Sequence, residues 1–174
     1  MKRIILSSLA IFLLTSQPIK AQPSNAFTGT PPTFVGATVP HNSVGFRLSW
    51  YYFTTNLPVD SQQSLGKLTI TPGSNFSTID FNLNETQAFL GSFRNRGEAI
   101  NIQQVNLDPD NQTIEIIFAE PIPPDTVFTV GLRARQNPTS EGVYLFRIYA
   151  FPAGDNPIGL DLGVARLSFY QSFW

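Results

Sequence analysis

Short runs of alternating apolar and polar residues recur along this chain and limit its possible folds more than any other feature. Side chains on a strand point alternately to its two faces, so such runs predict strands with one buried face. Gly, Pro, Asn and Asp separate the runs, as in antiparallel sandwiches and barrels. The predicted strands are Phe34–Val39, Phe46–Phe53, Lys67–Thr71, Thr78–Leu83, Ile102–Leu107, Thr113–Phe118, Val127–Ala134, Val143–Phe151 and Ala165–Tyr170. We therefore expect an all-β, immunoglobulin-like antiparallel β-sandwich of about eight or nine strands in a single domain.

The alternation also assigns the faces of these strands. In the second strand we expect Trp50 in the core beside Leu48 and Tyr52, so that Trp50→Ala would cost about 3–5 kcal/mol. The outward residues of that strand are then Arg47, Ser49 and Tyr51. Elsewhere the expected core residues are Ile79, Phe81, Leu83, Ile114, Ile116, Phe118, Phe128, Val130, Leu132, Tyr144, Phe146, Ile148, Leu167 and Phe169.

One segment favours a short helix instead of a strand. Asn84 can cap a helix, Gln87 follows three residues later as in a capping box, and Gly91 can end the turn. A basic loop with Arg94 and Arg96 follows it. We expect this loop to be exposed.

The N-terminus has the pattern of a secretory signal peptide. Lys2 and Arg3 precede the apolar run Ile4–Leu14, and Ala21 is the small residue expected before a cleaved bond. The apolar run is shorter than the roughly 20 residues that span a bilayer, so we expect a processed protein that does not cross the membrane. The predicted divisions are a signal peptide over 1–21, a flexible lead-in over 22–33, the sandwich over 34–170 and a tail over 171–174. We expect export to the periplasm, the cell surface or the medium.

Composition argues against most catalytic and nucleic-acid-binding functions. After cleavage, 8 of the 11 basic residues remain against 12 acidic ones, so the net charge is near −4 and does not suit a nucleic-acid partner. The chain has no cysteine, and His41 is its one histidine, which excludes cysteine-based zinc sites and leaves one candidate catalytic base. We therefore expect no metal, no cofactor and no catalytic residues.

Paired carboxylates give the weakest hypothesis, a small carboxylate hydrolase. The available acidic residues occur mostly beside Pro, Asn or Gly, where aspartate serves the backbone of turns. They are Asp108, Asp110, Glu120, Asp125, Asp155 and Asp161.

Outward arginines and tyrosines are the positive indication of function. Arginine and tyrosine together suit anionic or glycan ligands, through bidentate contacts and ring stacking. If strands from the two ends of the chain share a sheet, these side chains form one patch. The candidate binding residues are Arg47, Tyr51, Arg147, Tyr149, Arg166 and Tyr170, with Arg94 and Arg96 of the basic loop. The first hypothesis is thus a non-catalytic binding module for an anionic or glycan ligand, with an envelope polymer or protein as partner.

A second hypothesis is a structural or assembly protein. Such a protein would dock a partner through a sheet edge or through the aromatic C-terminus, Phe173 and Trp174. A long uncovered edge strand would favour this hypothesis over the first.

Several segments resemble one known family. They are Gly142–Phe146, Ala150–Gly154, Asn156-Pro157, Arg166–Tyr170, Pro121–Pro124 and Phe81–Phe89 followed by a basic loop and Gly97. In these segments the chain is similar to a family of exported cyanobacterial proteins catalogued as a domain of unknown function (DUF2808). The resemblance covers roughly residues 34 to 170 and implies a periplasmic or extracellular setting. It implies no catalytic residues.

Overall fold

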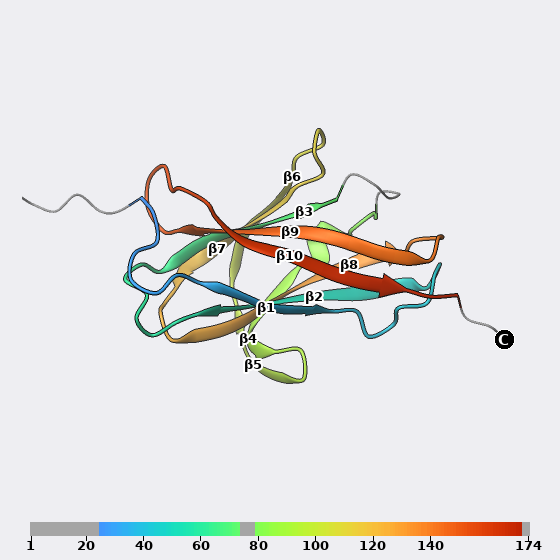
Figure 1. Ribbon diagram of the computed structural model, residues 1–174, viewed down its shortest axis with the longest axis horizontal. Helices are drawn as coiled ribbons and strands as arrows, with labels where there is room; N and C mark the ends of the chain where they lie inside the picture. Colours follow the sequence, from blue (N-terminus) through green and yellow to red (C-terminus); the bar gives the residue numbers. More distant parts are fainter. Residues whose placement is uncertain (1–24, 74–78, 172–174) are drawn as a thin grey trace, which may run out of the picture.

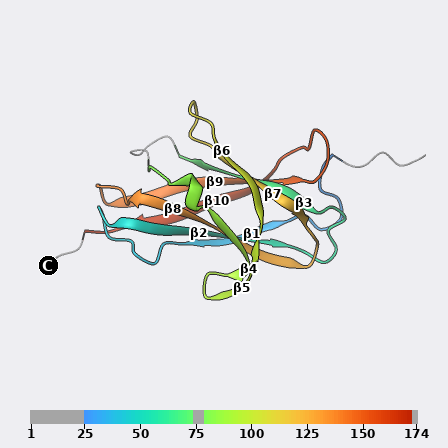
Figure 2. The same ribbon diagram turned by 180° about the vertical axis from the view of Figure 1, so that it is seen from behind.

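The computed structural model describes residues 25–73 and 79–171, and these residues form two antiparallel five-stranded sheets packed face to face (Figures 1 and 2). The first sheet has the strand order β1-β2-β8-β4-β5 and the second has the order β10-β9-β3-β7-β6. The strands of the first sheet are β1 (Thr33–Thr38), β2 (Arg47–Leu57), β8 (Thr126–Gln136), β4 (Gln87–Ser92) and β5 (Asn95–Ile100). Those of the second are β10 (Leu160–Phe169), β9 (Gly142–Pro152), β3 (Leu65–Pro72), β7 (Ile114–Ile122) and β6 (Ile102–Leu107). The prediction of an immunoglobulin-like antiparallel β-sandwich is confirmed, with β4 and β5 beyond the predicted strands.

The predicted helix is wrong. The one helical turn among the described residues is a 3-10 helix, η1 (Leu83–Glu85), which Asn82 precedes. The segment after it is β4, because Ala88 reaches the core and β4 pairs with β8, and Gly91 then lets the chain fold back into β5. Of the strand predicted over Thr78–Leu83, residues 79–83 form a single bridge, between Phe81 and Ala134, and Thr78 lies outside the described residues.

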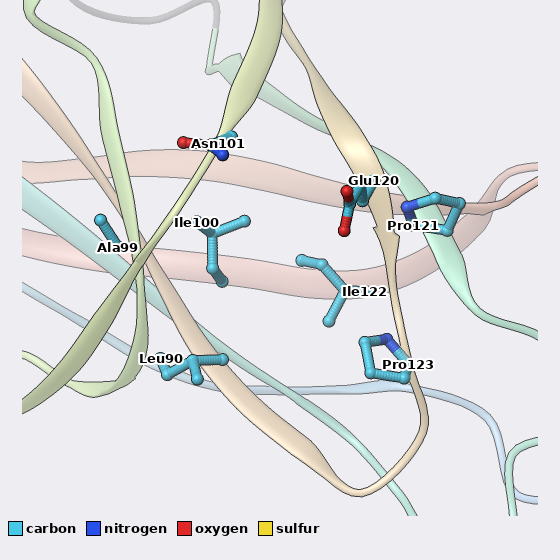
Figure 3. Close-up of a pocket in the computed structure, with 8 residues that line it drawn as sticks. All are labelled: Leu90, Ala99, Ile100, Asn101, Glu120, Pro121, Ile122 and Pro123. Atoms are coloured by element: carbon cyan, nitrogen blue, oxygen red, sulfur yellow. The ribbon is translucent and has the colours of Figure 1, made fainter.

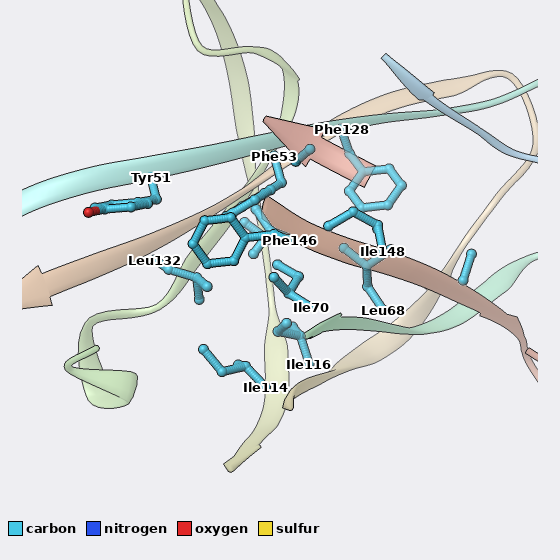
Figure 4. Close-up of a cluster of buried hydrophobic side chains, with 14 of the residues drawn as sticks. Tyr51, Phe53, Leu68, Ile70, Ile114, Ile116, Phe128, Leu132, Phe146 and Ile148 are labelled. Atoms are coloured by element: carbon cyan, nitrogen blue, oxygen red, sulfur yellow. The ribbon is translucent and has the colours of Figure 1, made fainter. Parts of the chain in front are cut away.

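Aromatic and branched aliphatic side chains from both sheets fill the space between the layers (Figure 4). Phe146 of β9 makes edge contacts with Tyr51 and Phe53 of β2, at ring-centroid distances of 6.2 and 5.6 Å. Phe118 and Phe128 meet edge to face across the layers at 5.6 Å. The inward residues predicted for β7, β8, β9 and β10 are all in this core.

The predicted faces of β2 are wrong. Ser49, Tyr51 and Phe53 are fully buried in the core, whereas Trp50 is half-buried on the outer face. Leu48, expected inside, is 55% exposed and has a φ of 58°, an unusual conformation for a leucine. β2 carries aromatic residues on both of its faces. The alternation therefore did not decide which face packs against the opposite sheet.

Within the N-terminal stretch that we predicted to be flexible (22–33), the described residues 25–33 contact the loop after β2. Thr28 donates its backbone N–H to Gln63 Oε1 at 2.5 Å, and Gln62 donates its backbone N–H to the Thr28 carbonyl at 3.1 Å. Gly29 forms a bridge with Ser61. The ordered domain therefore begins before Phe34. The predicted signal peptide and the aromatic C-terminus lie outside the described residues.

The two sheets are joined differently at their two sides. On one side β5 ends at Ile100 and β6 begins at Ile102, so the chain crosses from one sheet edge to the other at Asn101. On the other side Val44 donates its backbone N–H to the Tyr170 carbonyl at 3.0 Å. No helix in residues 25–73 and 79–171 is long and apolar enough to span a membrane.

Candidate functional site

The arginines and tyrosines proposed from the sequence do not form one patch. Arg47 lies on β2 of the first sheet, whereas Arg147 and Arg166 lie on β9 and β10 of the second sheet. Arg147 forms an ion pair with Asp161, with 3.2 Å between Nη2 and Oδ2. Tyr149 is half-buried on β9, opposite Asp161 in the strand register. The prediction of a single Arg/Tyr face is therefore wrong, because its strands belong to opposite sheets.

Tyr51 is a core residue and not a surface one. Its hydroxyl donates to Asn137 Oδ1 at 3.0 Å, and burial, with a smaller effect of Tyr144, raises the pKa of this hydroxyl above its ordinary range. Asn137 Nδ2 in turn donates to the carbonyls of His41 at 2.7 Å and Ser43 at 2.9 Å. Tyr51 thus anchors the loop before β2 from inside the sandwich.

Three other proposed residues are exposed. Tyr170 is 59% exposed just after β10, and Arg94 lies at the tip of the β4–β5 hairpin. Arg96, two residues further on, lies over aromatic rings of the first sheet. Of the residues proposed from the sequence, Arg96 is the one that packs within a larger group of aromatic and basic side chains.

That surface is a row of two arginines and three aromatic side chains on the outer face of the first sheet, which we call the guanidinium–aromatic row. It consists of Arg133, Trp50, Tyr52, Phe93 and Arg96. The Arg133 guanidinium lies 5.5 Å from the Trp50 ring, which stacks at 6.0 Å on Tyr52. Tyr52 stacks at 4.6 Å on Phe93, and the Arg96 guanidinium lies 4.8 Å from the Tyr52 ring.

Strand register explains the central part of the row. Trp50 and Tyr52 are two residues apart on β2 and therefore share a face, and Arg133 of β8 is the register partner of Trp50. The partner of Tyr52 is Gly131, where a Cβ would lie 3.0 Å from Tyr52 Cε1. A glycine at this position lets the tyrosine ring lie flat across the neighbouring strand.

The β4–β5 hairpin supplies the other end of the row. Phe93 is in its turn, and Arg96 of β5 packs over Phe89 as well, with 4.7 Å from guanidinium to ring centroid. Gly91 has a φ of 82°, and a Cβ there would lie 2.2 Å from the Asn95 carbonyl oxygen. The tight return of the hairpin thus requires glycine, and it folds Phe93 and Arg96 onto Tyr52, which is 3% exposed as a result.

The two arginines of the row differ in their charge partners. Arg133 Nη1 forms an ion pair with Glu85 Oε2, and both side chains are partly exposed. Arg96 donates from Nη2 to the Tyr52 hydroxyl, and within the described residues no carboxylate lies within ion-pair distance of it. The positive charge of Arg96 is therefore available to an anionic group.

Sequence reasoning did not name Trp50, Tyr52, Phe93 or Arg133 as candidate binding residues. The spacing of Trp50 and Tyr52 did contain the signal, since two aromatic residues at positions i and i+2 share one face of a strand. Only the assignment of that face to the core was wrong. The contribution of Phe93 depends on the hairpin, which we had predicted as a helix followed by a loop.

The outer face of the second sheet carries a separate polar network. Lys67 Nζ donates to Glu115 Oε1 at 2.6 Å, and Asn106 Nδ2 donates to Glu115 Oε2 at 3.1 Å. These hydrogen bonds, that of Lys67 first, lower the pKa of the Glu115 carboxyl. Lys67 also lies 4.3 Å from the centre of the Phe151 ring. The polar groups of this network form hydrogen bonds with one another, which favours a stabilising role.

A pocket opens at the side of the sandwich where the chain crosses between the sheets (Figure 3). Its lining comes from β4, β5, the crossover and the end of β7. The lining residues are Leu90, Ala99, Ile100, Asn101, Glu120, Pro121, Ile122 and Pro123. Two other surface hollows are each lined by one acidic residue as well, Asp80 and Glu141. Within residues 25–73 and 79–171, no three metal-ligating side chains lie together.

Comparison with known proteins identifies the family. The family model described as "Protein of unknown function (DUF2808)" matches residues 25–169. The chain belongs to this family. No curated protein matches the sequence.

Solved structures similar to this DUF2808 chain share its fold. BslA, described as a bacterial hydrophobin, is 17% identical with a TM-score of 0.51, over 84% of this chain and 99% of that chain. The collagen-binding subdomain ACE19 of the Enterococcus faecalis surface protein ACE is 8% identical with a TM-score of 0.50, over 80% of this chain and 98% of that chain. At these identities the likeness extends to the sandwich architecture alone.

Proposed function

We propose that this DUF2808 protein is an exported, non-catalytic binding module of the cell envelope that holds a glycan against the guanidinium–aromatic row. The observation that carries the proposal is the half-buried Trp50 ring, which lies between the Arg133 guanidinium and Tyr52. The exposed part of an aromatic ring offers an apolar surface to the C–H face of a sugar, and guanidinium groups beside it bind hydroxyls and acidic substituents. Contact with Tyr52 and Arg133 limits the motion of Trp50, so little conformational entropy is lost on binding.

The charges of the row indicate a glycan with acidic groups. Arg133 is already paired with Glu85, whereas Arg96 retains donors beyond the one used on Tyr52. A carboxylate, sulfate or phosphate on the glycan could therefore bind Arg96 while a neighbouring sugar stacks on Trp50. Since Arg96 is exposed, we expect affinity to fall as ionic strength rises.

The carboxylates beside the row and in the pocket of Figure 3 favour binding over hydrolysis. Glycoside hydrolysis requires two carboxyl groups about 5–9.5 Å apart. Beside the row, the Glu85 carboxylate forms an ion pair with Arg133. The pocket of Figure 3 contains Glu120 as its one carboxylate.

The proposal is tested with the Trp50→Ala and Trp50→Tyr variants on an array of neutral and acidic bacterial polysaccharides. We expect Trp50→Ala to weaken binding at least tenfold, with a stability loss of about 1 kcal/mol because the ring is only half-buried. Trp50→Tyr keeps a stacking ring and should retain most of the affinity. Melting curves recorded alongside separate lost binding from lost folding.

Val127→Ala is the matched control, since Val127 is a 42% exposed residue of β8 away from the row. It should leave binding unchanged. Equal affinities of the wild type and Trp50→Ala, or binding by the wild type to no polysaccharide on the array, would contradict the proposal.

A further inference from the structure

The pocket of Figure 3 lies at the free edges of both sheets. β5 is the last strand of the first sheet and β6 the last of the second, and the pocket is beside the crossover that joins them. Figure 3 shows Ile100 and Ile122 facing each other across the pocket, with Leu90 below them and the Glu120 carboxylate directed toward the same space. The pocket thus combines apolar walls with one acid.

Glu120 is exposed and is the one acidic side chain in the lining of this pocket. The ion pairs of the described residues join Lys67 to Glu115, Arg133 to Glu85, Arg135 to Asp80 and Arg147 to Asp161. Glu120 has neither an ion pair nor a side-chain hydrogen bond within residues 25–73 and 79–171. A carboxylate next to apolar surface attracts a cation more strongly than one in open water. A positively charged group therefore complements the charge of this pocket.

The size of the pocket limits what can fill it. Its volume is about 200 Å³, whereas pockets for whole small molecules usually span about 300–1,000 Å³. One apolar side chain fits such a space better than a complete ligand. The unpaired edge of β5 next to it offers backbone N–H and C=O groups, which an added strand can satisfy.

We propose that an extended segment of a partner protein docks here by pairing with the edge of β5. The segment places an apolar side chain between Ile100 and Ile122 and a lysine or arginine on Glu120. Side chains two positions apart in a strand share a face about 6–7 Å apart, so an alternating segment presents both groups to the pocket. The site is distinct from the guanidinium–aromatic row and does not depend on the function proposed for that row.

The test is an NMR titration of the purified, 15N-labelled protein with a capped peptide of threonines that contains lysine and leucine two positions apart. We expect saturable shifts of the amides of residues 99–101 and 120–123. A peptide with glutamate in place of lysine should bind at least fivefold more weakly, and so should one whose backbone is N-methylated at the pairing positions.

Protein variants locate the binding site. Glu120→Gln should weaken binding at least fivefold, and so should Ile100→Ala, which removes one apolar wall of the pocket. Glu98→Gln, on the same strand but outside the lining, is the matched control and should change affinity less than twofold. If Ile100→Ala fails to fold, Glu120→Gln serves the same purpose.

Three results would overturn the proposal. They are no saturable shift at millimolar peptide, equal binding of the lysine and glutamate peptides, and shifts confined to the region of Trp50. The last result would assign peptide binding to the guanidinium–aromatic row instead.

Discussion

At the scale of single residues, Tyr51 shows how a polar group can hold a surface loop from inside the core. Its ring packs among Phe81, Phe146 and Phe169, and its hydroxyl reaches Asn137. Asn137 is 2% exposed, and its Nδ2 donates two hydrogen bonds that position the chain before β2. The Tyr51 side chain therefore stabilises the fold, whereas the neighbouring Trp50 and Tyr52 belong to the guanidinium–aromatic row.

This environment predicts a specific alkaline instability. Burial raises the pKa of Tyr51 above the ordinary value of about 10, so above that pH the unfolded chain binds fewer protons than the folded one. The contribution of Tyr51 is fully present below pH 10, and above it the free energy of unfolding should fall by about 1.4 kcal/mol per pH unit. Urea unfolding between pH 7 and pH 11 measures this slope.

Tyr51→Phe should reduce that slope and cost about 1–3 kcal/mol at pH 7, because Asn137 Oδ1 loses its donor. Tyr170→Phe removes an exposed hydroxyl and should not change the urea midpoint at pH 7. Parallel pH profiles for the wild type and Tyr51→Phe would show that this hydroxyl does not limit alkaline stability.

At the scale of elements, the β4–β5 hairpin joins the two surfaces to which we assign binding. One of its faces brings Phe93 and Arg96 to Tyr52, and the other contributes Leu90 and Ile100 to the pocket. The hairpin projects from the end of its sheet in Figures 1 and 2. Its conformation depends on Gly91, where the φ of 82° and the close Asn95 carbonyl exclude a side chain.

Gly91→Ala should therefore destabilise the hairpin locally. We expect a loss of about 1–3 kcal/mol and faster hydrogen exchange of the amides of residues 95–100, since a Cβ would have to displace the Asn95 carbonyl. Gly36→Ala is the matched control, because nothing lies within 4 Å of a Cβ at that glycine. Unchanged exchange in β5 would contradict this account of the hairpin.

At the scale of the whole molecule, one core serves both sheets, and Phe146 is central to it. Its side chain is 1% exposed and contacts rings of the opposite sheet as well as Phe81 from the segment before η1. Since the buried hydrophobic residues of the described part of the chain form one cluster shared by both sheets, we expect the two sheets to unfold together.

Phe146→Ala should cost about 3–5 kcal/mol, a large part of the roughly 5–15 kcal/mol that stabilises a domain. Urea unfolding followed by tryptophan fluorescence and by far-UV circular dichroism should give coincident transitions in the wild type and in the variant. Val35→Ala, at a 62% exposed position, should shift stability by no more than about 0.5 kcal/mol. Separate transitions by the two probes would show that the sheets unfold independently.

The sequence alone established the fold class and most of the core, because in most strands one phase is apolar and the other polar. In β9, for example, Tyr144, Phe146 and Ile148 alternate with residues that include Arg147, so only one phase can face the core. The turn residues between the strands supported the same antiparallel arrangement.

The tertiary structure decided the features that depend on contacts between distant segments. In β2 both phases are aromatic, and the opposite sheet selects Tyr51 and Phe53 for burial while the hairpin covers Tyr52. In β4 the local capping pattern favours a helix, yet pairing with β8 supplies backbone hydrogen bonds and buries Ala88. The grouping of Arg133 and Arg96 around Trp50 and Tyr52 likewise follows from strand order and register, which local alternation does not encode.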